Sequence, residues 1–185
     1  MAVVVTPATF SLVNFDAADI VRIAERLRDE IGLSADLDIR IEVDEQSPTA
    51  RALTTSSDPL VVTVEGGAFE DPKKIRSLSE PNVADVLGVL FEQAGDRLEP
   101  GFGAPAPDAE TSLPHRVAWD ITAVGRLERL GHRVQRPRRL YQFRNRHGFS
   151  DGSDAAFERL WSQRPATWQE LVAISDDARS ASLLT

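Results

Sequence analysis

The stretch between Leu37 and Val43 constrains the fold more than any other part of the chain, because it alternates strictly between apolar and charged side chains. The apolar positions are Leu37, Ile39, Ile41 and Val43, and the charged positions are Asp38, Arg40 and Glu42. Successive side chains of a β-strand point to opposite faces, so this pattern predicts a strand with one buried and one solvated face.

A second strand is predicted at residues 59–64, where the run PLVVTV is β-branched and continuously apolar. Such a run is typical of a strand near the centre of a sheet. A short strand near residues 50–54 is expected before it, because the TSSD that separates the two is typical of a turn.

Apolar residues at helical spacing predict three long helices, at about residues 16–31, 82–98 and 114–131. Asp16 and Asn82 are of the residue types that cap helix N-termini, and we expect them to cap the first two helices.

Two short helices are predicted near the C-terminus. We expect Ser153 to cap the first of them, and Thr167 with Glu170 to form a capping box at the second. The elements together predict an α+β fold, with a small mixed or antiparallel sheet packed on two long helices. We expect one domain over residues 1–150 and a short helical extension over residues 151–185, packed on the same domain.

Composition excludes several classes of chemistry. The chain has no cysteine, so it forms no disulfide, thiolate zinc site or iron–sulfur cluster and has no cysteine nucleophile. No apolar run approaches the roughly 18 residues that cross a bilayer, and the first residues lack the basic flank of a signal peptide. We therefore expect a cytoplasmic protein that does not enter a membrane.

The stretch VLFEQAGDRL at residues 89–98 has the rhythm of a zinc-hydrolase helix without its histidines. Such a helix carries two histidines four residues apart, with a glutamate beside the first as general base. The corresponding positions here hold Phe91, Glu92 and Gly95. Both metal ligands are missing while the glutamate remains, so we expect no zinc and no other cofactor at this helix.

The order of elements over residues 16–131 resembles that of the minimal zincin-like metallopeptidase domains. The stretch AWDITAVGRLERLG, residues 118–131, also resembles the second long helix of some bacterial zincin-like proteins. The resemblance implies a domain that has lost its metal site, with Phe91 at the former ion position. The alternative is an ordinary amphipathic helix in an unrelated α+β fold.

Other metal or catalytic sites have weak signals. The three histidines are 17 and 15 residues apart, which matches no local ligand spacing. Glu92 and Asp96 lie one helical turn apart and could form a carboxylate site for Mg²⁺ or Ca²⁺, although a solvated helix face is the favoured reading. Glu128 follows the apolar stripe of its helix, so we expect a buried carboxylate paired with an arginine, or one that lines a cleft with Phe91, Glu92 and Gly95.

Residues 126–146 are strongly basic in a chain whose net charge is −8. Eight arginines and one acid give this segment a charge of +7, and the arginines are Arg126, Arg129, Arg133, Arg136, Arg138, Arg139, Arg144 and Arg146. The last six mark a candidate surface for an anion or a partner. Tyr141, Phe143 and Phe149 are interleaved with them, as in proteins that bind phosphates and unstacked bases.

An alternative interpretation is that these arginines pair with carboxylates of the same chain or of a second subunit, and we favour it over nucleic acid. Pro137 divides the segment, so we expect a helix end, a turn and a second helix. The sequence as a whole favours a catalytically inactive, zincin-like binding or interaction module in a bacterial cytoplasm, with a protein partner or a homo-oligomer. A metal-dependent hydrolase with unrecognised ligands, and a nucleic-acid or phosphate binder through residues 126–146, are the alternatives.

Overall fold

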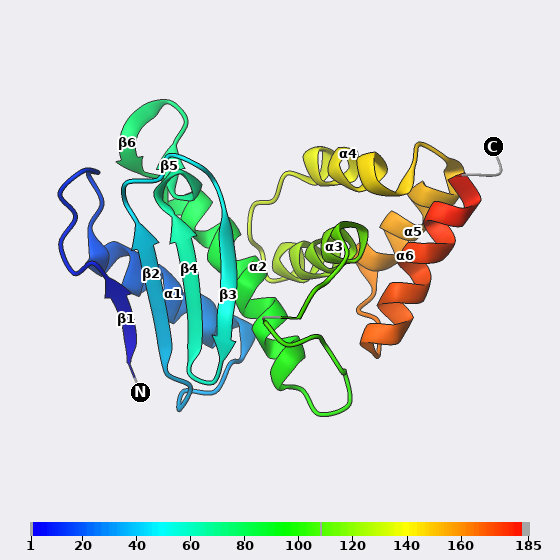
Figure 1. Ribbon diagram of the computed structural model, residues 1–185, viewed down its shortest axis with the longest axis horizontal. Helices are drawn as coiled ribbons and strands as arrows, with labels where there is room; N and C mark the ends of the chain where they lie inside the picture. Colours follow the sequence, from blue (N-terminus) through cyan, green and yellow to red (C-terminus); the bar gives the residue numbers. More distant parts are fainter. Residues whose placement is uncertain (1, 108, 183–185) are drawn as a thin grey trace. The chain divides into compact units, whose positions relative to one another are not determined.

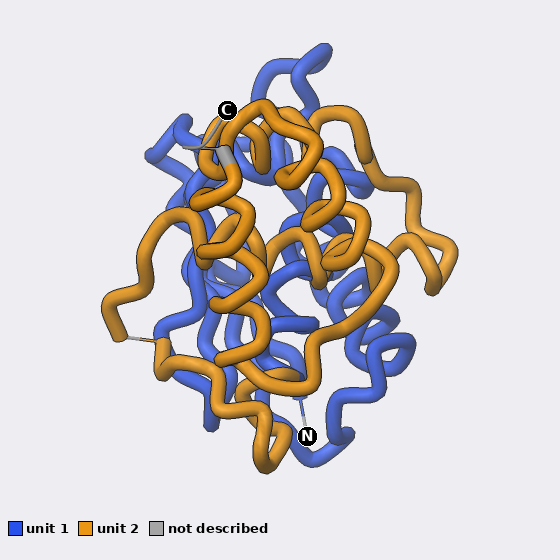
Figure 2. The backbone as a smooth tube through the Cα atoms, turned by 90° about the vertical axis from the view of Figure 1, so that its right-hand side faces the viewer, with its two compact units in different colours: residues 1–95 blue, residues 96–185 orange. Residues whose placement is uncertain are grey.

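The computed structural model describes residues 2–107 and 109–182 and shows an α+β protein with a small mixed sheet. The chain divides into two compact units, residues 1–95 and residues 96–185, which Figure 2 draws in blue and orange. The boundary lies inside one long helix, after Gly95. The sequence instead predicts a domain boundary after residue 150. That predicted boundary differs from the division into two units and stays a prediction.

The first unit contains a four-stranded sheet in the order β1-β2-β4-β3. Its strands are β1 (Val3–Thr6), β2 (Ile39–Asp44), β3 (Ala52–Ser57) and β4 (Leu60–Glu65). β1 and β4 both run parallel to β2, whereas β3 forms an antiparallel hairpin with β4. The strands predicted at residues 37–43, 50–54 and 59–64 are therefore confirmed as β2, β3 and β4, with ends shifted by a few residues.

One face of this sheet is covered by α1 (Ala17–Ile31) and α2 (Glu80–Leu98), as Figure 1 shows. The alternating side chains of β2 do what their pattern predicts, since Ile39, Ile41 and Val43 are buried and the charged residues between them are exposed. They pack in one core with apolar residues of both helices, Phe91 among them. Asp16 caps α1 through its side chain, which accepts a hydrogen bond from the amide of Ala18 at 2.8 Å.

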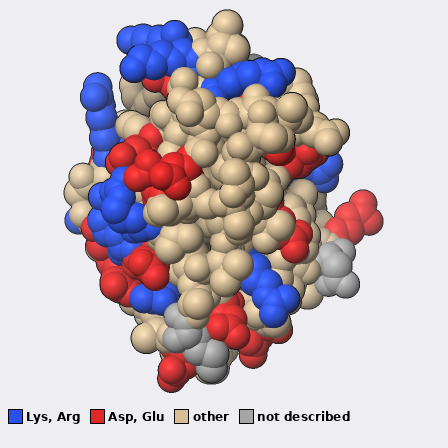
Figure 3. Space-filling view, turned by 90° about the vertical axis from the view of Figure 1, so that its left-hand side faces the viewer, with Lys and Arg blue, Asp and Glu red and all other residues tan. Residues whose placement is uncertain are grey.

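A short 3-10 turn, Gly66–Ala68, and a small two-stranded sheet follow β4. The two strands are β5 (Glu70–Asp71) and β6 (Lys74–Leu78). Figure 3 shows basic side chains gathered at the top of the molecule, where Figure 1 places this hairpin. Ile75 at its tip is 87% exposed. The sequence pattern did not predict these strands, because they lack apolar alternation.

The second unit is helical. It contains α3 (Leu113–Arg129), α4 (Arg136–His147), α5 (Asp151–Ser162) and α6 (Trp168–Ser182). α3 packs against each of the other three helices. The predicted helix break near Pro137 is confirmed, because α3 ends at Arg129 and Pro137 lies in the first turn of α4. Among the described residues, none of the helices has both the length and the apolar character needed to cross a membrane.

Two helix caps lie three residues earlier than predicted. Asn82 lies inside the first turn of α2, where its amide donates to the hydroxyl oxygen of Ser79 and its side chain donates to the carbonyl of Glu70. Likewise, Ser150 caps α5, and Ser153 lies inside the helix with its hydroxyl buried. In both cases two capping residues lie three positions apart, so the spacing alone does not choose between them.

Candidate anion-binding site

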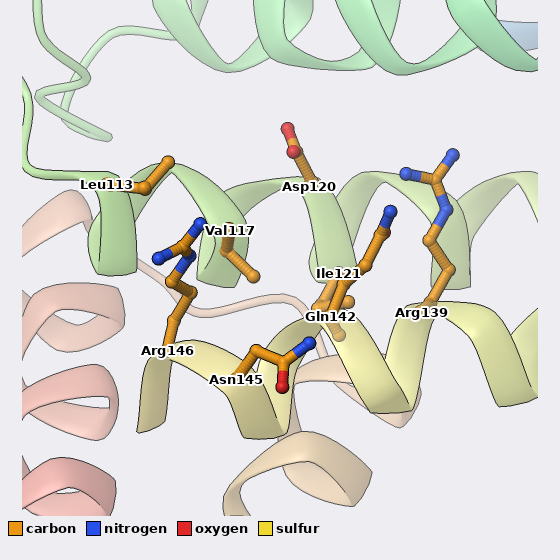
Figure 4. A pocket seen from close by; sticks show the side chains of 8 residues that line it. All are labelled: Leu113, Val117, Asp120, Ile121, Arg139, Gln142, Asn145 and Arg146. Atoms are coloured by element: carbon orange, nitrogen blue, oxygen red, sulfur yellow. The ribbon is translucent and has the colours of Figure 1, made fainter. Parts of the chain in front are cut away.

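The side chains of α3 and α4 enclose a shallow groove of about 260 Å³. The helix α4 is held against the helical unit by Phe143 and His147, which lie one turn apart on its buried side. Its groove side therefore carries different residues, and these are polar. Figure 4 shows the lining residues, which are Leu113, Val117, Asp120 and Ile121 of α3 and Arg139, Gln142, Asn145 and Arg146 of α4.

Two arginines of α4 are used inside the helical unit. Arg144 donates to both carboxylate oxygens of Asp154, from Nε at 2.7 Å, and this bond holds the pKa of the Asp154 carboxyl below its ordinary value. Arg136 pairs with Glu158 and lies over the ring of Trp161, with 5.2 Å between its Cζ and the ring centroid. These arginines pair with carboxylates of the same chain, as the alternative interpretation of the basic segment expects.

The remaining arginines of the candidate surface are differently placed. Arg139 and Arg146 line the groove, whereas Arg133 and Arg138 are exposed outside it. Within the described part of the chain, Arg133, Arg138 and Arg146 form no ion pair. The structure thus separates arginines that pair internally, such as Arg136 and Arg144, from Arg133, Arg138 and Arg146, which are exposed.

The groove combines cationic, amide and apolar groups. Arg146 and Arg139 lie two helical turns apart, about 10 Å along the axis of α4, with Asn145 and Gln142 between them. Apolar side chains of Val117 and Ile121 line the opposite side. Guanidinium groups donate paired hydrogen bonds to phosphate or carboxylate oxygens, and the amides both donate and accept. Asp120 adds a carboxylate to the lining.

The residues of the predicted cleft belong to both units: Phe91, Glu92 and Gly95 lie in the first and Glu128 lies in the second. Phe91 is fully buried in the core of the first unit, and Glu92 is also buried. Gly95 has the side chain of Leu33 beside it, 3.5 Å from the position that a Cβ atom would take. Glu128 belongs to the second unit and is exposed, not buried as expected. Its carboxylate accepts a hydrogen bond from the indole of Trp161 at 2.6 Å instead of pairing with an arginine.

Asp96 corrects the expectation of a solvated acidic helix face. Its side chain is 1% exposed and accepts hydrogen bonds from Arg126 at 2.6 Å, from Arg164 at 2.8 Å and from the indole of Trp119 at 2.7 Å. Two guanidinium groups on one buried carboxylate leave it no free position for a metal ion. The sequence does not reveal this cluster, since Arg164 is 68 residues away from Asp96.

A serine–histidine pair is buried in the helical unit. The Nε2 atom of His147 lies 2.8 Å from the hydroxyl of Ser175, and the Nδ1 atom lies 3.0 Å from the carbonyl of Phe143. Burial lowers the pKa of His147 to about 4, so the ring is neutral near pH 7. A neutral ring has one N–H, which Nδ1 donates to the carbonyl, and Nε2 then accepts from Ser175. Ser175 is fully buried, so the pair supports the fold and has no access to a substrate.

In the described residues, no group of three or more histidine, aspartate or glutamate side chains is arranged to hold a metal ion. The chain matches no protein-family model, no curated protein and no solved structure.

Proposed function

We propose that this chain is a non-catalytic binding module of a bacterial cytoplasm that holds the anionic group of a ligand in the groove between α3 and α4. The observation that carries the proposal is the position of Arg146. It lines the groove, it is exposed, and it forms no ion pair with another described residue. An arginine in this position is available to an external anion.

The neighbouring arginines support this reading by contrast. Arg136 and Arg144 each have a carboxylate within the helical unit. Intramolecular pairing therefore accounts for part of the basic segment, and Arg146 is a groove residue that it does not account for. A charge-assisted hydrogen bond contributes about 1.5–3 kcal/mol, so a groove in which Arg146 binds the anion is suited to a weak, reversible complex after the cost of association is subtracted.

The resemblance to zincin-like domains belongs to the same proposal. Phe91 packs in the core of the first unit, which suits a residue that has replaced a metal ligand and now stabilises the fold. Gly95 has no side chain that could bind a metal. A domain of this ancestry would keep its scaffold and act by binding, as the groove suggests.

Calorimetric titration with inorganic pyrophosphate tests the proposal, because this probe carries two phosphate groups and no base or sugar. We expect binding by the wild-type chain and an affinity about tenfold lower for Arg146→Gln, which corresponds to the loss of about 1.4 kcal/mol. Arg26→Gln is the matched control, since Arg26 is an exposed arginine of α1 in the other unit. No binding by the wild type, or equal losses in both variants, would overturn the proposal.

A further inference from the structure

Two aromatic side chains are exposed beside the groove. Tyr141 of α4 is 60% exposed and Phe149, just after the helix, is 65% exposed. Their rings contact each other, with 6.1 Å between the centroids and an angle of 68° between the planes. A single exposed apolar side chain needs no explanation, but two large rings that contact each other in solvent form a surface that another molecule can cover.

This aromatic pair is continuous with the polar side chains of α4. Residues three and four apart share a helix face, so Tyr141 is a neighbour of both Arg138 and Asn145. Arg138 is exposed and forms no ion pair with another described residue, and Asn145 also lines the groove. We call this the α4 surface, and its residues are Arg138, Tyr141, Gln142, Asn145, Arg146 and Phe149.

We infer that the α4 surface binds single-stranded nucleic acid, with bases stacked on Tyr141 and Phe149 and phosphates bound by Arg138 and Arg146. This inference rests on the proposed function and names the class of its ligand. Aromatic side chains beside cationic ones are the combination that binds single strands, because every base has a face that stacks and every nucleotide has a charge. The amides of Gln142 and Asn145 add donors and acceptors for base edges.

The composition of the α4 surface favours a single strand over other anionic partners. A helical peptide that docks on a protein needs a row of aliphatic contacts, whereas the large exposed apolar side chains between residues 136 and 150 are the two aromatic rings. A duplex is bound mainly through its phosphates and keeps its bases paired and stacked, so its bases are not open to stacking on Tyr141 and Phe149. Stacking on unpaired bases gives binding energy that does not depend on charge, about 1–3 kcal/mol for each base.

The inference is tested by fluorescence anisotropy with a labelled single strand of twelve deoxythymidines at low salt. We expect Tyr141→Ala and Phe149→Ala each to weaken binding about tenfold, and Tyr141→Phe to bind like the wild type because it keeps the ring. Leu12→Ala is the matched control, since Leu12 is an exposed apolar residue in the first unit. Because both aromatic side chains are exposed, thermal unfolding of these variants should be unchanged.

Arg138→Gln should weaken binding and reduce the slope of log affinity against log salt by about 0.7, the value for one phosphate contact on a single strand. Equal affinity for a duplex of the same length, or for an acidic polyglutamate peptide, would show attraction by charge alone and overturn the inference. Unchanged binding by Tyr141→Ala would also overturn it. If pyrophosphate still binds in a manner that depends on Arg146 while the single strand does not bind, the proposed function stands and this inference fails.

Discussion

The imidazole of His147 lies parallel to the ring of Phe143, with 3.8 Å between the ring centroids, and Nε2 of the same histidine accepts from Ser175. The histidine is 1% exposed. Its environment therefore accepts the neutral ring and opposes the charged one, which explains why the pKa of His147 falls to about 4.

This pKa predicts a loss of stability in acid. An unfolded histidine titrates near pH 6.5, so the unfolded chain binds the proton first and the free energy of unfolding declines as the pH falls from about 6.5 to about 4. The expected loss over this range is roughly 3 kcal/mol. All three tryptophans lie between residues 119 and 168, so tryptophan fluorescence in urea reports unfolding of the helical unit.

Carboxylates also titrate between pH 6.5 and pH 4 and change the free energy of unfolding. The variant His147→Gln separates their contribution from that of His147. The variant should be less stable than the wild type at pH 7, with a smaller further loss at pH 4. Parallel stability curves for the two proteins would contradict the role assigned to His147.

The carboxylate of Asp96 predicts a large effect for a small substitution. Asp96→Asn removes the buried negative charge that two partly buried guanidinium groups, those of Arg126 and Arg164, share. We expect the free energy of unfolding of the helical unit to fall by about 3 kcal/mol, measured by tryptophan fluorescence in urea.

Glu99→Gln is the control for Asp96, because Glu99 also pairs with Arg164 but is 49% exposed. An exposed pair contributes at most about 1 kcal/mol. If the two substitutions cost the same, the Asp96 cluster does not hold the helical unit together in the way described.

At Gly125 the helices α3 and α5 pack so closely that there is no room for a side chain. A Cβ atom at this position would lie 2.2 Å from the carbonyl oxygen of Trp161, and that oxygen belongs to the backbone and cannot rotate away. Gly125→Ala should therefore destabilise the helical unit by at least about 2 kcal/mol.

Gly95→Ala is the matched substitution, since its Cβ atom would be 3.5 Å from Leu33 and α2 would gain a better helix former. Its thermal unfolding temperature should be unchanged or raised. A tolerated alanine at Gly125 would show that α3 and α5 are further apart than described.

The absence of ligand atoms at Phe91 and Gly95 predicts the metal content of the purified protein. We expect elemental analysis to find far less than one zinc ion per chain, because the helix positions that would carry two imidazoles hold a buried ring and no side chain. A stoichiometric transition metal would contradict the non-catalytic proposal and favour the metal-dependent hydrolase.

Local patterns explain which parts of the fold were predictable. The helix α1 was predicted with its N-cap, because Asp16 bonds to the amide of Ala18, only two residues away in the sequence. The strand β2 was predicted because its alternating residues give it one apolar face for the core, and this alternation can be read from the sequence of the strand itself. In contrast, the edge strand β1 is four residues long, and its pairing with β2 joins segments more than thirty residues apart. No local pattern carries that pairing.

The same distinction applies to the site. Charge composition located the groove arginines, since Arg139 and Arg146 belong to the segment that stands out in the sequence. Composition does not show which arginines have partners, because Arg144 and Arg146 look alike until Asp154 is placed beside one of them. For the same reason, the sequence predictions that Glu128 is buried and that Asp96 is exposed were both wrong. Their burial depends on residues far away in the sequence.

The account is tested most directly by the amide spectrum of the ¹⁵N-labelled protein during titration with inorganic pyrophosphate. We predict that the shifted resonances cluster on the groove residues of α3 and α4, around Val117, Ile121 and Arg146, and that Arg146→Gln raises the pyrophosphate concentration at which these shifts are half complete by about tenfold. Shifts that are absent at saturating pyrophosphate, or that cluster on a surface outside the groove, would contradict the claim that α3 and α4 form an anion-binding site.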